Sequence, residues 1–263
     1  MIDTERAFAH WREALGQWAI PADILDQAPT SPWIHPVELF DVSGLDVIPD
    51  SPSHAAARAG LPAGGTLLDI GCGGGRAAFA CVPPAAHVIG VDHQQGMLDA
   101  FTQVAGRRGV GVETVLGDWP QVAGSTPVAD VVTCHHVFYN IPDLRPFIDA
   151  LDNHARRRVV VELPALHPLA NLTPWWEHFW QLQRPTTPTA FDAADCVRAL
   201  GHDVHIEEFE ARAPSPIDED TAVRFMRIRL CLPEERDDEV RDFMRALAPE
   251  PRRNVTLWWE PRH

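Results

Sequence analysis

One ten-residue stretch decides the fold of this chain: Leu67-Leu68-Asp69-Ile70-Gly71-Cys72-Gly73-Gly74-Gly75-Arg76. The apolar residues before Gly71 predict a short buried strand, and the glycines that follow predict a turn leading into a helix. Glycine lets a ligand approach the backbone closely, and the first turn of a helix presents unpaired N–H groups. The stretch therefore predicts a strand, a ligand-binding turn and a helix in direct succession.

The residues around these glycines argue against a dinucleotide site. A G-x-G-x-x-G fingerprint counted from Gly71 needs glycine or alanine at its sixth position, where this sequence has Arg76. Asp69 comes two residues before the first glycine, and a carboxylate at a strand tip suits a cationic ammonium group better than a pyrophosphate. The expected ligand therefore carries an amino acid.

Five short apolar runs alternate with helical patterns between residues 54 and 165. The runs are Thr66 to Ile70, His87 to Asp92, Val112 to Leu116, Asp130 to Cys134 and Arg158 to Glu162. Continuous hydrophobicity, as in Val159-Val160-Val161, is typical of parallel strands that are buried on both faces. Between the runs, two sets of apolar residues recur at helical spacing: Met97, Leu98, Phe101 and Val104, then Leu144, Phe147, Ile148 and Leu151. The pattern predicts an α/β fold with a mostly parallel sheet and helices on both faces.

The flanking segments predict additions to one domain. Residues 1–53 carry a helical pattern and a proline-broken segment, so we expect an N-terminal helical extension, followed by a single domain over residues 54–263. Residues 166–190 lack a strand pattern and contain Trp175-Trp176-Glu177-His178-Phe179-Trp180, which predicts a lid-like aromatic insertion after the fifth strand. In the extension, Trp33 and His35 could close over a ligand.

The C-terminal third predicts the rest of the sheet. A helix is expected from Asp192 as N-cap to Gly201 as C-cap, followed by a strand from Val204 to Phe209. Two more helices and a last strand from Val255 to Trp259 complete the chain.

Four residues of the glycine stretch match the first motif of a known enzyme family. They are Asp69, Gly71, Gly73 and Gly75, an acidic residue followed by three glycines at alternate positions. By this motif the chain resembles the class I S-adenosylmethionine-dependent methyltransferases. The resemblance implies a Rossmann-like seven-stranded sheet with an antiparallel seventh strand, and a turn that binds S-adenosylmethionine as cofactor, with Cys72 included.

Later motifs follow in the order that the resemblance implies. Asp92 ends the second run, 21 positions after Gly71, and corresponds to the acidic residue that binds both ribose hydroxyls. Gly117-Asp118-Trp119 stands where the adenine is expected, with Asp118 accepting from its amino group and Trp119 stacking on its ring. By position, His93 and Met97 are further candidates for the wall beside the adenine.

The candidate catalytic residues follow the fourth and fifth runs. In the resemblance, His135 and His136 end the fourth-strand motif beside the methionine part of the cofactor, where His135 also counts as a cofactor contact, and Glu162 ends the fifth run. Methyl transfer from a sulfonium is an in-line displacement, so the protein mainly aligns the acceptor. An oxygen or nitrogen acceptor that sheds a proton would use His135, His136, Tyr139 or Glu162 as its base, whereas a tertiary amine or thiolate needs none. Packed core histidines are the alternative reading.

Composition limits the partners. The 37 acidic against 22 basic residues give a net charge of -15, which repels nucleic-acid phosphates and anionic lipid surfaces. Neither N-P-P-Y nor D-P-P-Y follows the fourth run, where Phe138-Tyr139-Asn140-Ile141 stands instead. We therefore expect a small-molecule methyl acceptor, with no nucleic acid and no membrane as partner. The acceptor's identity and the oligomeric state stay open.

The remaining features predict a soluble cytoplasmic protein without a metal site. No apolar run reaches the roughly 20 residues of a membrane span. The five cysteines form no C-x-x-C pair and are expected to be buried free thiols, and the histidines form no H-E-x-x-H motif. Two alternatives remain at this point: a non-catalytic S-adenosylmethionine-binding regulator and an NAD-dependent oxidoreductase, which Asp69 and Arg76 disfavour.

Overall fold

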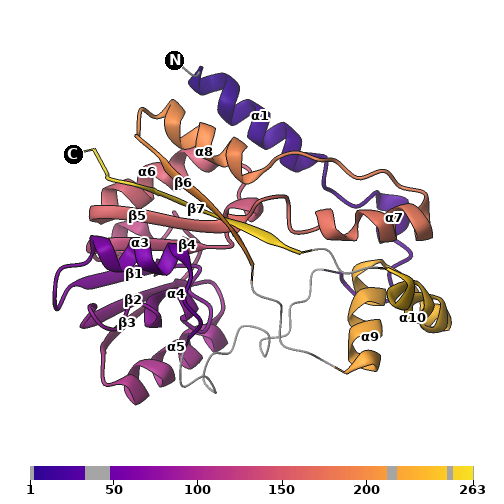
Figure 1. Ribbon diagram of the computed structural model, residues 1–263, viewed down its shortest axis with the longest axis horizontal. Coiled ribbons are helices and arrows are strands. Elements are labelled where there is room, and N and C mark those ends of the chain that lie inside the picture. The colour runs from indigo at the N-terminus through magenta and orange to yellow at the C-terminus, as the bar shows by residue number, and fades with distance from the viewer. Residues whose placement is uncertain (1–2, 33–47, 212–217, 248–250, 263) are drawn as a thin grey trace.

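A computed structural model describes residues 3–32, 48–211, 218–247 and 251–262. In these ranges the chain forms a seven-stranded sheet in the order β3-β2-β1-β4-β5-β7-β6, with helices on both faces (Figure 1). This is the Rossmann-like α/β fold predicted from the sequence. Within the same ranges every helix is too short or too polar to cross a bilayer. Trp33 and His35 lie outside the described residues.

Five neighbouring strands pair in parallel, and one of the other two runs against them. The parallel strands are β1 (Thr66–Ile70), β2 (His87–Asp92), β3 (Gly111–Leu116), β4 (Ala129–His135) and β5 (Ala155–Pro164). β7 (Arg253–Trp259) is antiparallel and lies between β5 and β6 (His205–Glu210). The antiparallel last strand was therefore predicted correctly. All parallel strands end at one edge of the sheet, where open α/β sheets bind their ligands.

Ten α-helices connect or flank these strands in the described ranges. They are α1 (Thr4–Gly16), α2 (Ala22–Leu25), α3 (Pro52–Gly60), α4 (Arg76–Phe79), α5 (Gln95–Arg108), α6 (Leu144–His154), α7 (Thr173–Trp180), α8 (Ala190–Ala199), α9 (Glu219–Arg229) and α10 (Asp237–Ala246). α3 begins two residues before the expected domain boundary at residue 54.

The two faces of the sheet each carry a hydrophobic core. Val160 packs with α3, α4 and α5, whereas Val159 and Val161 pack on the other face with α1, α6 and α8, and all three valines have no exposed surface. Continuous hydrophobicity thus predicted burial on both faces correctly for β5. It was wrong for β3, because this strand lies at the sheet edge and Leu116 is 53% exposed.

The start of α8 corrects one expected boundary. The helix begins at Ala190, not at Asp192, because Thr189 is its N-cap. The Asp192 backbone N–H donates to Thr189 Oγ1, and the Asp192 carboxylate accepts from the Thr189 backbone N–H, which is a capping box. Asp192 is therefore the third helical residue. α8 ends at Ala199, and Gly201 follows with a φ of 91°.

A third core holds together a group of helices beyond the carboxyl ends of the parallel strands, at the right of the view in Figure 1. We call α2, α7, α9 and α10 the helical cap. Its core includes Ile24 of α2, Trp175 and Trp176 of α7, Val223 of α9 and Val240 of α10, all buried. The aromatic insertion is thus one wall of a small helical body.

Candidate functional site

The glycine turn after β1 offers an open backbone surface. Gly71, Gly73 and Gly75 have φ values of 67°, 49° and 89°, a region that favours glycine. Gly71 is exposed and Gly73 half-buried, and a Cβ at Gly71 would lie 2.5 Å from Val137 Cγ2. A side chain at Gly71 would therefore require Val137 to move, so the turn keeps its shape only with glycine.

The turn is fixed to the neighbouring strand by hydrogen bonds. The Gly71 and Cys72 N–H groups both donate to the Val91 carbonyl, at 2.9 and 3.0 Å. Cys72 itself is buried in the core under α5, and burial raises the pKa of its thiol. Gly75 is buried at the start of α4, where a Cβ would collide with Phe79. Of the motif's residues, Gly71 and Gly73 are thus the ones whose backbone a ligand can approach.

The Asp69 carboxylate already has hydrogen-bond donors within the protein. Its side chain is almost fully buried, and its carboxylate accepts from Thr133 Oγ1 at 2.8 Å and from the Ala78 N–H at 3.3 Å. Burial raises the pKa of Asp69 to about 7, against the lowering effect of these hydrogen bonds. In this structure Asp69 secures the first turn after the glycines, and its contact with an ammonium group stays a prediction.

Asp92 joins the glycine turn to the ends of two strands. Its Oδ2 accepts from the Gly73 N–H at 3.0 Å and its Oδ1 from the Gln94 N–H at 2.9 Å. The Asp92 carbonyl accepts from the Gly117 N–H at 3.0 Å. Each carboxylate oxygen has a second lone pair, so the group can still accept from ribose hydroxyls. The residue predicted for the ribose therefore lies next to the open part of the turn.

The residues expected beside the adenine divide into accessible and packed ones. His93 and Asp118 are exposed after β2 and β3, whereas Met97 is buried on α5. Trp119 is 7% exposed and packs edge-on against His154, with ring centroids 4.8 Å apart. Its ring is part of the core on the α6 side of the sheet, and its stacking on an adenine stays a prediction. Asp118 remains the candidate for the adenine amino group.

Two of the predicted catalytic residues meet at the ends of β4 and β5. His136 Nε2 lies 3.2 Å from Glu162 Oε1, and the His136 N–H donates to the Glu162 carbonyl at 2.6 Å. The His136 side chain is 49% exposed, whereas that of Glu162 is 9% exposed. His136 also has a φ of 61°, a conformation that costs a non-glycine residue free energy and is frequent at functional sites.

Glu162 is held in place from three sides. Its Oε2 accepts from Ser51 Oγ at 3.0 Å, and its Oε1 accepts from Asn254 Nδ2 at 3.1 Å in addition to the His136 contact. Burial alone would raise the pKa of Glu162, but the hydrogen bond from His136 is the largest of the influences that bring it below its usual range. Glu162 is therefore an ionised carboxylate that orients an imidazole.

His135 stacks on a histidine that sequence reasoning missed. The ring centroids of His135 and His54 are 5.6 Å apart with an interplanar angle of 14°. Burial lowers the pKa of His54 and, against the opposing charge of Glu162, lowers the pKa of His135 to about 3. His54, like Ser51, comes from the start of α3, before β1, and no sequence motif linked that helix to the ends of β4 and β5.

Tyr139 is not brought to this group. Its hydroxyl donates to the Pro164 carbonyl at 3.0 Å, its ring stacks on Trp11, and the residue is 5% exposed in the core. Burial raises the pKa of Tyr139 well above its usual range. Its expected role as a base is therefore withdrawn, because the hydroxyl is already engaged as a donor and resists deprotonation.

Comparisons with known proteins agree with this architecture. Residues 68–160 match the model of a family described as a methyltransferase domain. No curated protein matches the sequence. The fold is similar to the YcgJ protein of Bacillus subtilis, with 17% identity, a TM-score of 0.54, and coverage of 80% of this chain and 98% of that one.

Two further solved structures have the same fold and hold S-adenosyl-L-homocysteine. Both are S-adenosylmethionine-dependent methyltransferases, one from Thiobacillus denitrificans at 20% identity and one from Geobacter sulfurreducens at 19%. Each has a TM-score of 0.53, with 87% of this chain and 99% of the other covered. At these identities the similarity establishes the fold, and the matched domain spans β1 to β5, the strands that carry the site.

Proposed function

We propose that this chain is a class I S-adenosylmethionine-dependent methyltransferase and that it methylates a small molecule held between the strand ends and the helical cap. The observation that carries the proposal is the pairing of His136 with Glu162 at the edge of the sheet that also bears the glycine turn. The net charge of -15 supports an acceptor other than a nucleic acid.

The residues present fit the cofactor. The exposed backbone of Gly71 and Gly73 admits close approach, and the Asp92 carboxylate lies beside them with lone pairs left for ribose hydroxyls. Asp118 would accept from the adenine amino group, and His135 would lie near the methionine part. When bound, S-adenosylmethionine supplies an electrophilic methyl group on a sulfonium.

The protein's own contribution to the chemistry is alignment and a base. His136 Nε2–H donates to the Glu162 carboxylate, which leaves Nδ1 as the nitrogen that takes a proton from the acceptor. The ionised Glu162 then stabilises the imidazolium that forms, as a carboxylate does in a catalytic triad. The half-exposed His136 is the better base of the two histidines, because a pKa of about 3 makes His135 a poor proton acceptor near neutral pH.

The cofactor part of the proposal predicts a defined loss in Asp92→Ala. We expect wild-type protein to bind S-adenosylmethionine in the micromolar range, about −8 kcal/mol. The variant should lose roughly 1.5–3 kcal/mol of binding, since a charged acceptor is removed from the ribose and from the Gly73 N–H. Titration calorimetry measures both values, and Asp92→Asn, which keeps one acceptor oxygen, should lie between them. Equal dissociation constants for all three folded proteins would refute the ribose assignment.

The acceptor class is tested by turnover on a metabolite panel. Purified protein is incubated with methyl-labelled S-adenosylmethionine and pooled small metabolites, and S-adenosylhomocysteine and labelled products are followed by mass spectrometry. We expect label in a small molecule that contains a proton-bearing oxygen or nitrogen nucleophile. Label found only in added RNA, DNA or protein would contradict the small-molecule acceptor.

A further inference from the structure

A buried arginine lies in an aromatic sandwich between α1 and the helical cap. Arg184, in the segment 181–189 that joins α7 to α8, is 8% exposed. Its guanidinium lies over the rings of Trp18 and Trp176, 5.2 and 5.3 Å from their centroids. Nη1 donates to the Ala19 carbonyl at 3.3 Å and Nη2 to the Trp18 carbonyl at 2.5 Å.

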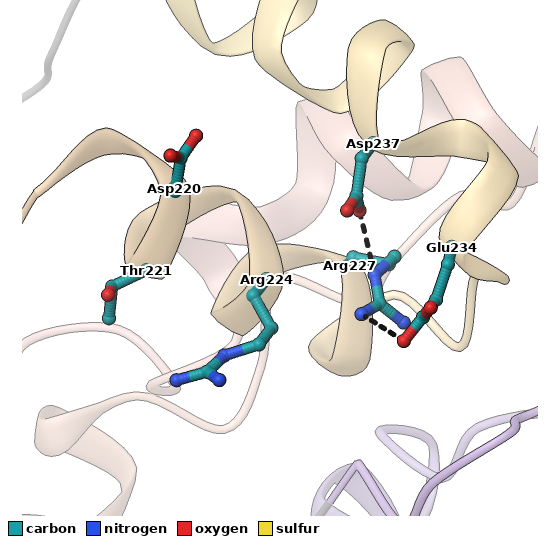
Figure 2. Close-up of a pocket in the computed structure, with 6 residues that line it drawn as sticks. All are labelled: Asp220, Thr221, Arg224, Arg227, Glu234 and Asp237. Atoms are coloured by element: carbon teal, nitrogen blue, oxygen red, sulfur yellow. Dashed lines mark hydrogen bonds and ion pairs between the residues drawn. The ribbon is translucent and has the colours of Figure 1, made fainter.

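This arginine has no carboxylate partner among the described residues. None of their ion pairs includes Arg184, and burial lowers its pKa. Figure 2 shows the usual arrangement in the same cap: Arg227, also buried, is held by Glu234 at 3.2 Å and Asp237 at 2.7 Å beside a hollow of about 340 Å³. A buried charge without a partner is costly, so Arg184 stands out against Arg227.

The atoms left without partners define the chemistry of the missing group. Arg184 Nε and Trp176 Nε1 are both buried and make no hydrogen bond to any residue that the structure describes, and Trp176 is 1% exposed. Both atoms are N–H donors, and the guanidinium next to them is positively charged. The group that would satisfy them is therefore an oxygen acceptor with a negative charge. A planar carboxylate matches the fork of a guanidinium.

Ring contacts connect this sandwich to the catalytic edge of the sheet. The His167 ring stacks on Trp18 with centroids 4.1 Å apart and lies edge-on to Tyr139 at 5.1 Å. Tyr139 follows β4, and its hydroxyl donates to the Pro164 carbonyl at the end of β5. Packed rings thus link Trp18, over which Arg184 lies, to the residues that follow β4 and end β5.

We propose that Arg184 and Trp176 bind a carboxylate of the methyl acceptor, so that this enzyme methylates small carboxylic acids at a position remote from the acid group. This inference rests on the proposed function, because the carboxylate site is the cap side of that acceptor site. Since neither nitrogen has exposed surface, the acid enters when the segment 181–189 moves away from α7. The association rate constant of the acid should therefore be lower than for a ligand that binds without a conformational change.

Benzoate and benzamide are the probes that test the carboxylate site, because they share a ring and differ in charge. Calorimetry and thermal unfolding are carried out on the full chain with and without S-adenosylmethionine. We expect benzoate, and not benzamide, to bind and to raise the unfolding midpoint. Arg184→Met should weaken benzoate binding at least about tenfold through loss of a charged hydrogen bond, and Trp176→Phe, which keeps a ring without the N–H, about two- to tenfold.

Matched variants distinguish the loss of the carboxylate site from a general loss of positive charge and from misfolding. Arg224→Met removes an exposed arginine of α9 and should leave benzoate affinity within about twofold of wild type. Should Arg184→Met not fold, Arg184→Lys keeps the charge without the planar fork and is expected to bind benzoate with intermediate affinity. Equal losses in the Arg184 and Arg224 variants would overturn the assignment.

The outcomes distinguish this inference from the proposed function. A wild-type protein that binds S-adenosylmethionine but does not respond to benzoate refutes the carboxylate site alone. A protein that binds benzoate through Arg184 but not S-adenosylmethionine refutes the proposed function and leaves an acid-binding site. A stronger response to inorganic phosphate than to benzoate would overturn the carboxylate as the ligand class.

Discussion

Replacing His136 by glutamine is expected to lower kcat by about 10²- to 10⁴-fold, the range that a positioned general base contributes. Glutamine can still donate to Glu162 but has no nitrogen that takes up a proton. The dissociation constant of S-adenosylmethionine should stay within about twofold, because the exposed imidazole is paired with Glu162 and not with the glycine turn. Single-turnover kinetics with the acceptor from the metabolite panel, together with calorimetry, measures both quantities.

Glu162→Gln tests the partner of His136 in the proposed pair. The variant keeps an oxygen and an amide in place, so Ser51 and Asn254 can retain hydrogen bonds, but the charge that stabilises an imidazolium is gone. We expect a smaller loss of kcat than in His136→Gln, and the double variant should be no worse than His136→Gln alone, because residues acting as a unit are not additive.

The control for the His136 variant is His10→Gln. His10 is a half-exposed histidine of α1 that pairs with Asp192 of α8 and not with Glu162. The His10→Gln variant should have the kcat of the wild-type protein. Full activity in a folded His136→Gln protein would contradict the base assignment and would point to an acceptor that sheds no proton.

The sequence predicted the sheet more completely than the site because strand patterns are local. The runs at Thr66–Ile70 and His87–Asp92 coincide with β1 and β2, and the last strand was predicted as antiparallel to its neighbours. Helix boundaries were less certain, as Asp192 shows, because Thr and Asp three residues apart can both cap the same helix start.

The site was predictable only where a motif follows a strand. Such motifs predicted His136 and Glu162 at adjoining strand ends, and the structure brings these two together. His54 and Arg184 carried no comparable signal, since their partners lie far away in the sequence: His54 meets His135, and Arg184 meets Trp18. Tyr139 was misleading because its polar atom suggested chemistry while its ring packs in the core.

Trp175→Ala is expected to cost about 3–5 kcal/mol of stability, the usual range for removing a large aromatic side chain from a core. Trp175 is 4% exposed, and its ring contacts Phe243 of α10 edge-on at 4.9 Å and stacks with Phe179 at 6.3 Å. The sequence predicted that this ring belongs to a lid-like aromatic insertion. Because it packs inside the cap, its loss should loosen α7 and α10 together.

Hydrogen exchange read segment by segment measures this effect. Backbone amides of α7, α9 and α10 should lose protection, while those of β1, β4 and β5 keep theirs, because the cap has a hydrophobic core separate from those of the sheet. S-adenosylmethionine affinity should then fall by no more than a few fold, about 1 kcal/mol, whereas methyl transfer should be lost with the acceptor site. Trp175→Phe is the matched control and should keep most of the protection. Uniform loss of protection across sheet and cap would show that the two unfold as one unit. The helical cap could then not open without also disturbing the glycine turn that binds the cofactor.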